Sequence, residues 1–231
     1  MKVSDRTYFV LKRLHSLTGV FPIGVFLLEH FYTNSMALQG AAAFDRAAAD
    51  LARIPYVGAV EAFGIWLPIL LHMVLGVFIA TTSKPNLERY GYATNWMYTM
   101  QRVTGVVLIF YIIFHTFQTR FDPAYLQSPS PYDFMRKQLS SPAMFWFMVV
   151  GILSACWHFG NGLFGFAIHW GFVTSRKAQL RVARLGLAFA VVLALVALNS
   201  LLAFTGRGLY PDWITKPHGQ DHAVVMDGGT R

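Results

Sequence analysis

The chain has 231 residues, of which 55% are hydrophobic and only 13% charged, and its mean hydropathy is +0.44. Soluble domains carry about 25% charged residues, so the composition excludes an ordinary soluble domain and indicates an integral membrane protein. The net charge of +8 does not indicate nucleic-acid binding, because the basic residues gather at the ends of apolar segments, where membrane proteins place them. The single cysteine, Cys156, excludes an intrachain disulfide and a cysteine-rich metal site.

Five apolar segments can each supply the ~20 residues that are needed to cross a ~30 Å hydrocarbon core. Lipid offers no partners to free backbone groups, so each segment is expected to be helical. In chain order they are residues 14–38, 59–82, 101–119, 143–173 and 185–204. We therefore predict an all-α fold, an integral membrane bundle of five transmembrane helices, in one domain over residues 1–206.

Two stretches outside these spans allow a structural prediction. The loop after the first span contains AAAFDRAAADLARI, which predicts a short surface helix. Residues 207–231 form a polar C-terminal tail with Gly and Pro, for which we expect no fixed structure.

Five spans place the two termini on opposite sides of the membrane. With the N-terminus inside, the inner side holds eleven of the 19 Lys and Arg residues and the outer side holds eight. The inner charges lie directly against the helix ends, where the positive-inside rule acts most strongly. We therefore predict a cytoplasmic N-terminus and a C-terminus outside.

Four histidines lie one in each of the first four spans: His30, His72, His115 and His158. The first two are 42 residues apart and the last two are 43 apart. Their surroundings repeat as well, because HSLTGV resembles QRVTGV, and HMVLGVF matches HFGNGLF as His-x3-Gly-x-Phe. The first four spans thus form two similar halves.

The position of each histidine within its span predicts two layers. His30 and His115 lie about 20 Å from the inner surface, at 1.5 Å per residue, whereas His72 and His158 lie a similar distance from the outer surface. Two imidazoles that face each other between helices are the axial ligands of a b-type haem. The pattern therefore predicts two b-type haems, stacked across the membrane and enclosed by the bundle.

Other residues near these histidines are candidates for holding a haem. Gly76 and Gly162 follow their histidines by one helical turn, and the missing side chains would let a flat macrocycle approach the backbone. Four polar residues gather at the inner ends of the first and third spans, where arginine offers a bidentate fork to a haem propionate. Positive-inside anchoring explains the two arginines equally well. The four are Arg13, His15, Ser16 and Arg102.

Three other interpretations of the intramembrane histidines fit the pattern less well than haem ligation. A lone histidine can simply hydrogen-bond a neighbouring helix. A zinc or copper site would need three or four ligands at one depth, and a transporter would need charged partners or broken helices in mid-membrane. His169 has no repeat partner and is interpreted as an interfacial residue, and His218 and His222 lie in the tail.

The chain closely resembles the cytochrome b subunit of Bacillus-type succinate dehydrogenase. The resemblance rests on RLHSLTGVFPIGVFLLEH, NWMYTMQRVTGV, LSSPAM and HFGNGLFGFAIHWG, and it runs from about Tyr8 to Phe204. The dihaem anchor of fumarate reductases is similar more distantly. Two departures are Glu29, where the Bacillus type carries an amide, and the longer tail.

The resemblance implies the five-helix dihaem membrane anchor of a succinate:menaquinone oxidoreductase, respiratory complex II. It implies His72 with His158 as the ligands of the proximal haem, and His30 with His115 as those of the distal haem. It also implies a flavoprotein (FAD) subunit and an iron–sulfur subunit on the cytoplasmic side of the bacterial inner membrane. This chain would transfer electrons and hold a quinone site, while succinate chemistry takes place in a partner subunit. A quinol:fumarate reductase anchor and the cytochrome b subunit of a hydrogenase or formate dehydrogenase are the alternatives.

Electrons would enter at the inner face, pass through both haems and reach menaquinone near the outer face, so the reaction would draw on the membrane potential. A quinone site therefore belongs among polar residues at the outer rim. The candidates are Glu29, Tyr32, Glu61 and Gln118, with Asn34 and Arg120 close by. A rival site at the inner face would use Trp96, Gln101 and Arg102.

Overall fold

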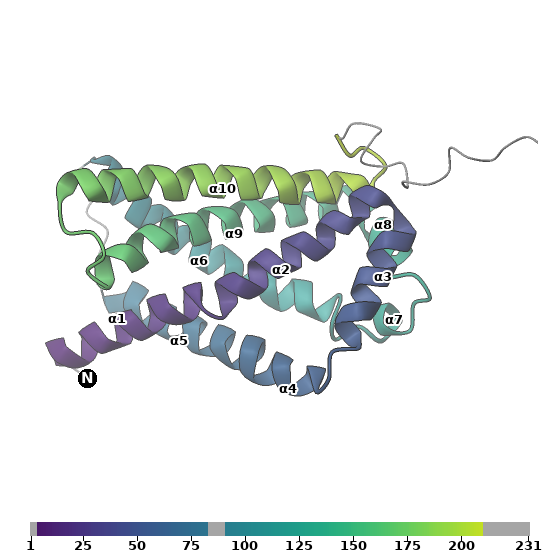
Figure 1. Cartoon of the computed structure of the whole chain (residues 1–231), viewed down its shortest axis with the longest axis horizontal. Coiled ribbons are helices and arrows are strands. Elements are labelled where there is room, and N and C mark those ends of the chain that lie inside the picture. The colour runs from purple at the N-terminus through teal and green to yellow at the C-terminus, as the bar shows by residue number, and fades with distance from the viewer. Residues whose placement is uncertain (1–3, 83–90, 210–231) are drawn as a thin grey trace, which may run out of the picture.

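A computed structural model of the chain describes residues 4–82 and 91–209 (Figure 1). Five helical segments are long and apolar enough to cross a membrane, which confirms the prediction of an all-α fold with five candidate spans. They are Asp5–Gln39, Val57–Thr82, Ala93–Phe117, Pro142–His169 and Arg176–Phe204. The first, third and fifth begin eight or nine residues before the predicted apolar segments. Hydropathy marks only the lipid-facing part of a helix, whereas its backbone hydrogen bonds continue into polar surroundings.

The first span is interrupted near its middle. It consists of α1 (Asp5–Val20), α2 (Ile23–Ser35) and the 3₁₀ turn η1 (Met36–Gln39). Pro22 lies between α1 and α2, and because proline has no N–H it cannot donate to the preceding turn. The helix resumes when the Phe26 N–H donates to the Pro22 carbonyl at 3.0 Å.

The remaining elements follow the predicted order. The short surface helix expected after the first span is present as α3 (Ala41–Ala52). The second span combines α4 (Val57–Glu61), the π-helical turn η2 (Ala62–Trp66) and α5 (Leu67–Thr82). After it come α6 (Ala93–Phe117), α7 (Pro123–Leu126), α8 (Pro131–Leu139), α9 (Pro142–His169) and α10 (Arg176–Phe204).

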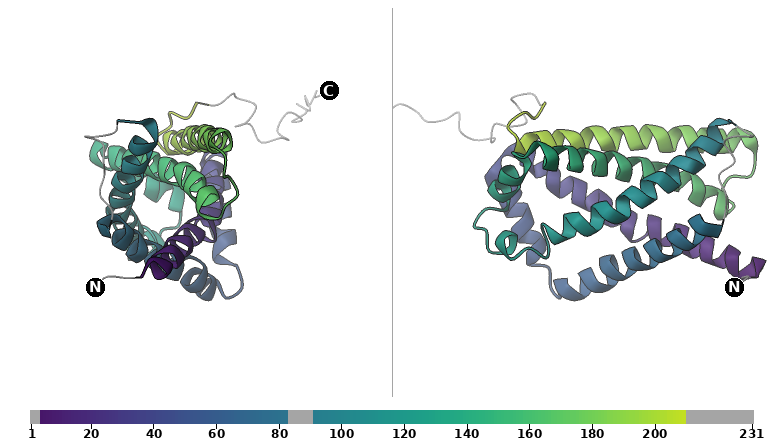
Figure 2. Two further views of the ribbon diagram at one scale, coloured as in Figure 1. Left: turned by 90° about the vertical axis from the view of Figure 1, so that its left-hand side faces the viewer. Right: turned by 180° about the vertical axis from the view of Figure 1, so that it is seen from behind.

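Helix α9 lies at the centre of the packing. It contacts α10, α6 and α1, while α1 contacts α5, and α10 also contacts α2. The end-on view in Figure 2 shows the first four spans grouped together, with α10 on the outside of α9. The four spans that carry the patterned histidines therefore surround a common interior, and the fifth span buttresses it.

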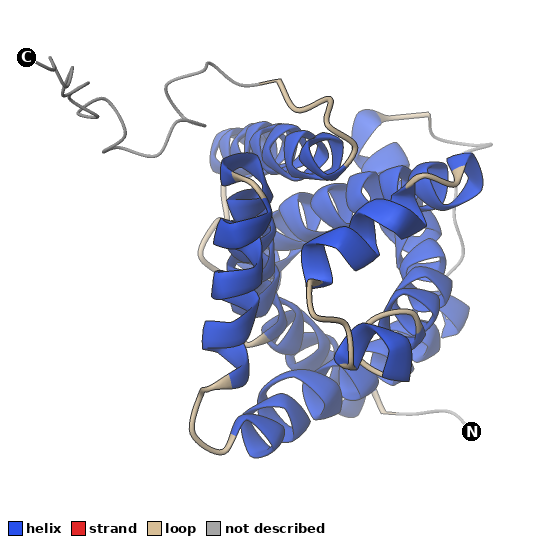
Figure 3. Cartoon of the chain, turned by 90° about the vertical axis from the view of Figure 1, so that its right-hand side faces the viewer, coloured by secondary structure: helices blue, strands red, loops and turns tan. Residues whose placement is uncertain are grey.

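The two ends of the bundle differ. At one end lie the start of α1, the end of α5 and the start of α6; we call this the N-terminal end (Figure 1). At the opposite end, the short helices α3, α7 and α8 lie across the bundle (Figure 3). There Asp45 of α3 accepts hydrogen bonds from the Ser130 hydroxyl at 2.7 Å and from the Tyr132 N–H at 2.8 Å. The carboxylate thus ties the first connection to the third.

The chain after α10 is only partly described. The Asn199 side chain bonds the Leu209 backbone in both directions, at 2.7 and 3.0 Å. The predicted boundary at residue 207 falls just after α10, and residues 210–231 of the predicted tail lie outside the described residues.

The contact between α9 and α10 depends on a missing side chain, which leads to a first testable prediction. A Cβ atom at Gly160 would collide with the Gly186 carbonyl oxygen and lie 2.7 Å from the Ala190 Cβ. The Gly160→Val variant is expected to push the helices apart and lose about 1–3 kcal/mol of stability, measured as thermal unfolding in detergent by circular dichroism. Gly165→Ala is the matched control, since no atom of the described residues lies within 4 Å of its Cβ position. Equal melting of both variants would contradict the close packing.

Candidate functional site

The four patterned histidines meet in two pairs inside the bundle. The rings of His72 on α5 and His158 on α9 have centroids 6.1 Å apart and planes at 79°. The rings of His30 on α2 and His115 on α6 have centroids 5.9 Å apart and planes at 78°. These are the two pairs that the spacing along the chain predicted.

The pairs occupy separate layers along the bundle. The Thr104 hydroxyl of α6 lies 3.2 Å from the His158 Nδ1 atom, so this residue marks the level of the first layer. His115 follows it by eleven residues on the same helix. At 1.5 Å per residue the layers are therefore about 16 Å apart along α6. The pair His72–His158 is nearer the N-terminal end, and the pair His30–His115 is nearer the opposite end.

The sequence repeat is also a repeat in three dimensions. His15 and His72 each donate from Nδ1 to the other's backbone carbonyl, at 3.1 and 2.9 Å. In the second half, the Gln101 amide donates to the His158 carbonyl at 3.0 Å and the His158 Nδ1 donates to the Gln101 carbonyl at 3.1 Å. Both pairs are 57 residues apart along the chain. The hairpin of α1 and α5 therefore folds like the hairpin of α6 and α9.

The unequal spacings of the repeat have a structural explanation. His158 follows His72 by 86 residues, whereas His115 follows His30 by 85. The one-residue difference falls between the aligned starts of the halves, at His15 and Gln101, and the paired histidines His30 and His115. In the first span this stretch includes the interruption at Pro22. Helix α6 crosses the corresponding region without a break. The interruption thus lets His30 reach His115 despite the change of register.

Two glycines that the sequence singled out face the neighbouring hairpin helix. A Cβ atom at Gly76 would lie 3.1 Å from the His15 Cε1 atom, and one at Gly162 would lie 3.6 Å from the Gln101 Nε2 atom. Both glycines thus occupy equivalent places in the two halves. Their role beside a macrocycle stays a prediction.

Two of the four propionate candidates lie at the end of α9. Arg13 donates from Nε to the His169 carbonyl at 3.1 Å, and its guanidinium lies 5.0 Å from the centre of the Trp170 ring. The Trp170 indole donates to the Ser16 hydroxyl oxygen at 3.2 Å. A cation at a helix C-terminus is favourable because the last carbonyls lack intrahelical partners. This arrangement joins the first span to the fourth at the N-terminal end of the bundle.

The other two candidates are placed elsewhere. His15 lies inside the bundle, where its ring stacks on His72 with centroids 3.9 Å apart. Arg102 donates to the Tyr98 hydroxyl at 2.7 Å, one turn earlier on α6. The structure therefore does not bring these four residues together in one cluster, and propionate binding stays a prediction for each.

Polar residues at the opposite end have different partners. Arg120, which follows α6, forms a bidentate ion pair with Glu61, with the shortest contact 2.8 Å from Nη2 to Oε2. The hydrogen bond with this carboxylate raises the pKa of the guanidinium above its ordinary value. Glu29 accepts a hydrogen bond from Thr33 on its own helix, and Tyr32 is 67% exposed. The four quinone candidates thus do not form one cluster.

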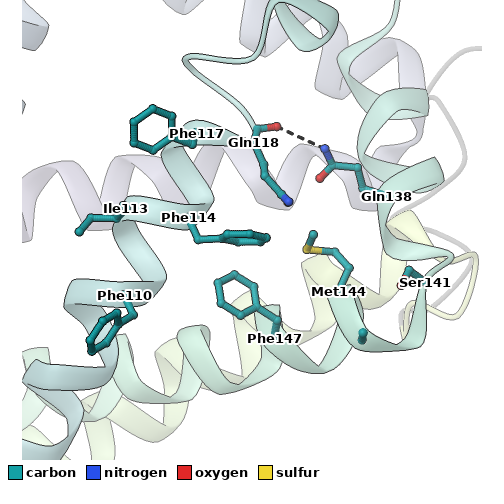
Figure 4. A pocket seen from close by; sticks show the side chains of 10 residues that line it. Phe110, Ile113, Phe114, Phe117, Gln118, Gln138, Ser141, Met144 and Phe147 are labelled. Atoms are coloured by element: carbon teal, nitrogen blue, oxygen red, sulfur yellow. Dashed lines mark hydrogen bonds between the residues drawn. The ribbon is translucent and has the colours of Figure 1, made fainter.

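Gln118 lies in a groove of about 880 Å³ between α6, α8 and α9 (Figure 4). Its side chain points into the groove, and its backbone carbonyl accepts a hydrogen bond from the Gln138 amide at 3.3 Å. The walls are apolar and largely aromatic. The side-chain amides of Gln118 and Gln138 lie at the end of the groove that is farther from the N-terminal end of the bundle. The lining residues are Phe110, Ile113, Phe114, Phe117, Gln118, Gln138, Ser141, Ala143, Met144 and Phe147.

The groove continues toward one of the paired histidines. A smaller cavity of about 240 Å³ shares Phe110 and Phe147 with it and is also lined by Tyr111. The Tyr111 ring stacks on His115, with centroids 5.5 Å apart and planes at 5°. One aromatic ring thus lies between this cavity and the imidazole pair His30–His115. The sequence analysis named Gln118 but missed Gln138 and Tyr111, since no sequence motif marks either residue as part of a site.

Comparison with known proteins decides the family. Residues 80–198 match the succinate dehydrogenase/fumarate reductase transmembrane subunit family. The chain is 40% identical over 202 residues to the succinate dehydrogenase cytochrome b558 subunit of Bacillus subtilis (strain 168), which covers 87% of this chain and 100% of the relative. The chain belongs to this transmembrane subunit family. It is therefore a membrane subunit of a succinate dehydrogenase or fumarate reductase complex, which confirms the family predicted from the sequence motifs.

Proposed function

We propose that this chain is the membrane-anchor cytochrome b subunit of a succinate:quinone oxidoreductase that holds two haems b and passes electrons to menaquinone. The observation that carries the proposal is the pair of facing imidazoles in each of two layers, found in a chain of this family. The name of the Bacillus subtilis relative, a cytochrome b558 subunit, supports haem b.

The imidazole pairs fit axial ligation of an iron. A metal–imidazole bond is about 2 Å long, and the ring centre lies about 1 Å beyond the nitrogen. Two rings on opposite sides of one metal are thus about 6 Å apart, close to the observed 5.9 and 6.1 Å. Among the residues that the structure describes, no three His, Cys, Asp or Glu side chains group as a zinc or copper site would require.

The chain's own groups would prepare each inner ligand. His72 and His158 donate from Nδ1 to backbone carbonyls at 2.9 and 3.1 Å, which fixes the tautomer and leaves the Nε2 lone pair for a metal. When bound, haem would supply a one-electron carrier whose potential depends on these surroundings. The second layer, about 16 Å away along α6, would continue the path toward the opposite end.

We place quinone at the end of the bundle opposite the N-terminus, in the groove beside α6. A quinone needs hydrogen-bond donors for its oxygens and an apolar surface for its isoprenoid tail. The amides of Gln118 and Gln138 lie in a groove with aromatic walls, at the end that is farther from the N-terminal end of the bundle. Tyr111, which stacks on His115, lines the adjoining cavity. Glu61 would be held by Arg120 at the same rim, where the ion pair could exchange protons with water.

We further propose that the N-terminal end faces the cytoplasm and binds the partner subunits. The basic residues of the spans crowd there, as the positive-inside rule favours. A flavoprotein subunit with FAD and an iron–sulfur subunit would dock on this face, next to the inner pair His72–His158. Electrons from the iron–sulfur subunit would therefore enter at the first layer. The family description also names fumarate reductase, so a quinol:fumarate reductase anchor is the second candidate.

Purification from native membranes tests the proposal directly. The chain is expected to copurify in detergent with a flavoprotein and an iron–sulfur protein, and a pyridine haemochrome assay should give two haems b per chain. The chain isolated without its partners should show no succinate dehydrogenase activity, because the proposed function gives this chain electron transfer and leaves succinate oxidation to a partner subunit. One haem per chain, or isolation without either partner, would contradict the proposal.

A further inference from the structure

We propose that Thr18 and Thr104 are positioning residues that orient the inner imidazoles and lower the reduction potential of the inner haem; this rests on the proposed function. The His72 Nδ1 atom lies 3.3 Å from the Thr18 hydroxyl oxygen, and the His158 Nδ1 atom lies 3.2 Å from the Thr104 hydroxyl oxygen. Both contacts join residues 54 apart along the chain. Each hairpin of the repeat therefore contributes one threonine to one ligand.

The direction of these hydrogen bonds follows from the other bonds that the hydroxyls make. Thr104 donates to the Met100 carbonyl of its own helix at 2.7 Å, and Thr18 donates to the His15 carbonyl at 3.0 Å. A hydroxyl has one proton and two lone pairs, so each oxygen turns a lone pair toward the imidazole and accepts from Nδ1–H. Both threonines are buried, with 8% and 5% exposure, so their protein partners are the main groups that their hydroxyls meet.

Each inner imidazole thus meets two oxygen acceptors at one nitrogen. The His72 Nδ1 atom meets the His15 carbonyl and the Thr18 hydroxyl. The His158 Nδ1 atom meets the Gln101 carbonyl and the Thr104 hydroxyl. Acceptors at the free ring nitrogen of a metal-bound histidine fix its orientation and raise its basicity as a ligand. A more basic ligand favours the more highly charged, oxidised metal.

The residue after each threonine is a glycine that faces the same imidazole ring. A Cβ atom at Gly19 would lie 2.6 Å from the His72 Cε1 atom, and one at Gly105 would lie 3.2 Å from the His158 Cε1 atom. The threonine thus binds the ring while the glycine leaves room for it. The repeated Thr-Gly-Val in HSLTGV and QRVTGV was visible in the sequence, but the ring that it faces was not.

The outer pair has different neighbours. The Asn34 amide lies 3.4 Å from the His30 Nε2 atom, and His115 stacks on Tyr111. The two layers therefore place their ligands in chemically distinct surroundings. A change at Thr18 or Thr104 should act on the inner haem alone.

The test is a redox titration of the purified complex, with both haems followed by low-temperature optical spectra. Thr18→Val and Thr104→Val should each shift the inner haem toward the reduced form by about threefold, and the double variant by about tenfold, since each removes one hydrogen bond of two. A tenfold shift is 59 mV for one electron. Because the two contacts are equivalent, the single variants should shift the potential equally. The outer haem should not change.

Three further variants separate positioning from general disturbance. Thr18→Ser and Thr104→Ser retain the hydroxyl and should restore the wild-type potential and the ferric electron paramagnetic resonance signal, which reports the angle between the ligand planes. Thr116→Val is the matched control, because among the described residues its hydroxyl bonds only the Ile112 and Ile113 carbonyls of its own helix. It should leave the inner haem unchanged.

The outcomes are distinguishable from failure of the proposed function. Unchanged inner potentials in both valine variants, or equal shifts of both haems, would overturn the positioning role while two haems per chain in the wild type still upheld the function. Loss of the inner haem in the valine variants with retention in the serine variants would support the role. Loss in both would overturn it, since the hydroxyl would not be the group that matters.

Discussion

Replacing His72 or His158 with alanine is expected to abolish one of the two haem spectra completely, and replacing His30 or His115 the other. The reason is the separation of the two layers, about 16 Å along α6, which prevents one histidine from serving both irons. Low-temperature difference spectra of membranes, together with immunoblots for the chain, would measure each haem against the amount of inserted protein.

His169→Ala is the matched control for these variants. This residue lies on α9, as His158 does, but its ring Nδ1 has no hydrogen-bond partner in the described structure. The control should keep both spectra. If an alanine variant is not inserted, His72→Met provides another axial ligand, which should keep the inner haem and raise its potential. The pairing would be wrong if His30→Ala and His72→Ala erased the same spectral component.

Succinate oxidation by menaquinone is expected to depend strongly on the membrane potential. Electrons would leave the negative cytoplasmic side and reach quinone near the positive outer side, so a normal potential drives this transfer. A full crossing contributes about 2.3 kcal/mol per electron at 100 mV. If a little over half of this free energy lowers the barrier of the rate-limiting step, an uncoupler should slow the reaction about tenfold.

Sealed inside-out vesicles energised by ATP hydrolysis give succinate access to the partner subunits and make the lumen positive. The rate would be measured before and after the uncoupler is added. Gln118→Leu removes an amide of the groove and should lower the rate with menaquinone. Trp96→Leu, at the opposite end of α6 and 54% exposed, is the control for a site at the cytoplasmic face. If the uncoupler does not change the rate and only Trp96→Leu abolishes it, the proposed quinone site in the groove at Gln118 would be refuted.

Gln101 is a poor probe of the cytoplasmic-face site, although the sequence suggested it. Its amide donates to the His158 carbonyl and accepts from the Asn161 amide at 2.8 Å. A change there would disturb the backbone of an inner ligand directly. Only the folded structure separates this role from quinone binding.

The amino-acid sequence alone predicted the class of protein and the two histidine layers of its candidate site. Apolar length decides whether a segment can span a bilayer, and lipid then allows only a helix, so the five spans could be predicted without any contact information. The spacing of His30, His72, His115 and His158 determined two layers, because helix geometry converts residue number into depth. The family motifs lie in these same stretches.

Only the tertiary structure showed which side chains contact the paired histidines and which line the groove. Sequence periodicity places residues on a helix but does not say which face meets which neighbour. His15 looked like an inner-surface residue, yet the packing of α1 on α5 brings its ring onto His72. Thr18 and Thr104 became candidates only when the hairpins closed on the imidazoles. The groove at Gln118 likewise needs α8 and α9 to meet the end of α6, and no local signal specifies that approach.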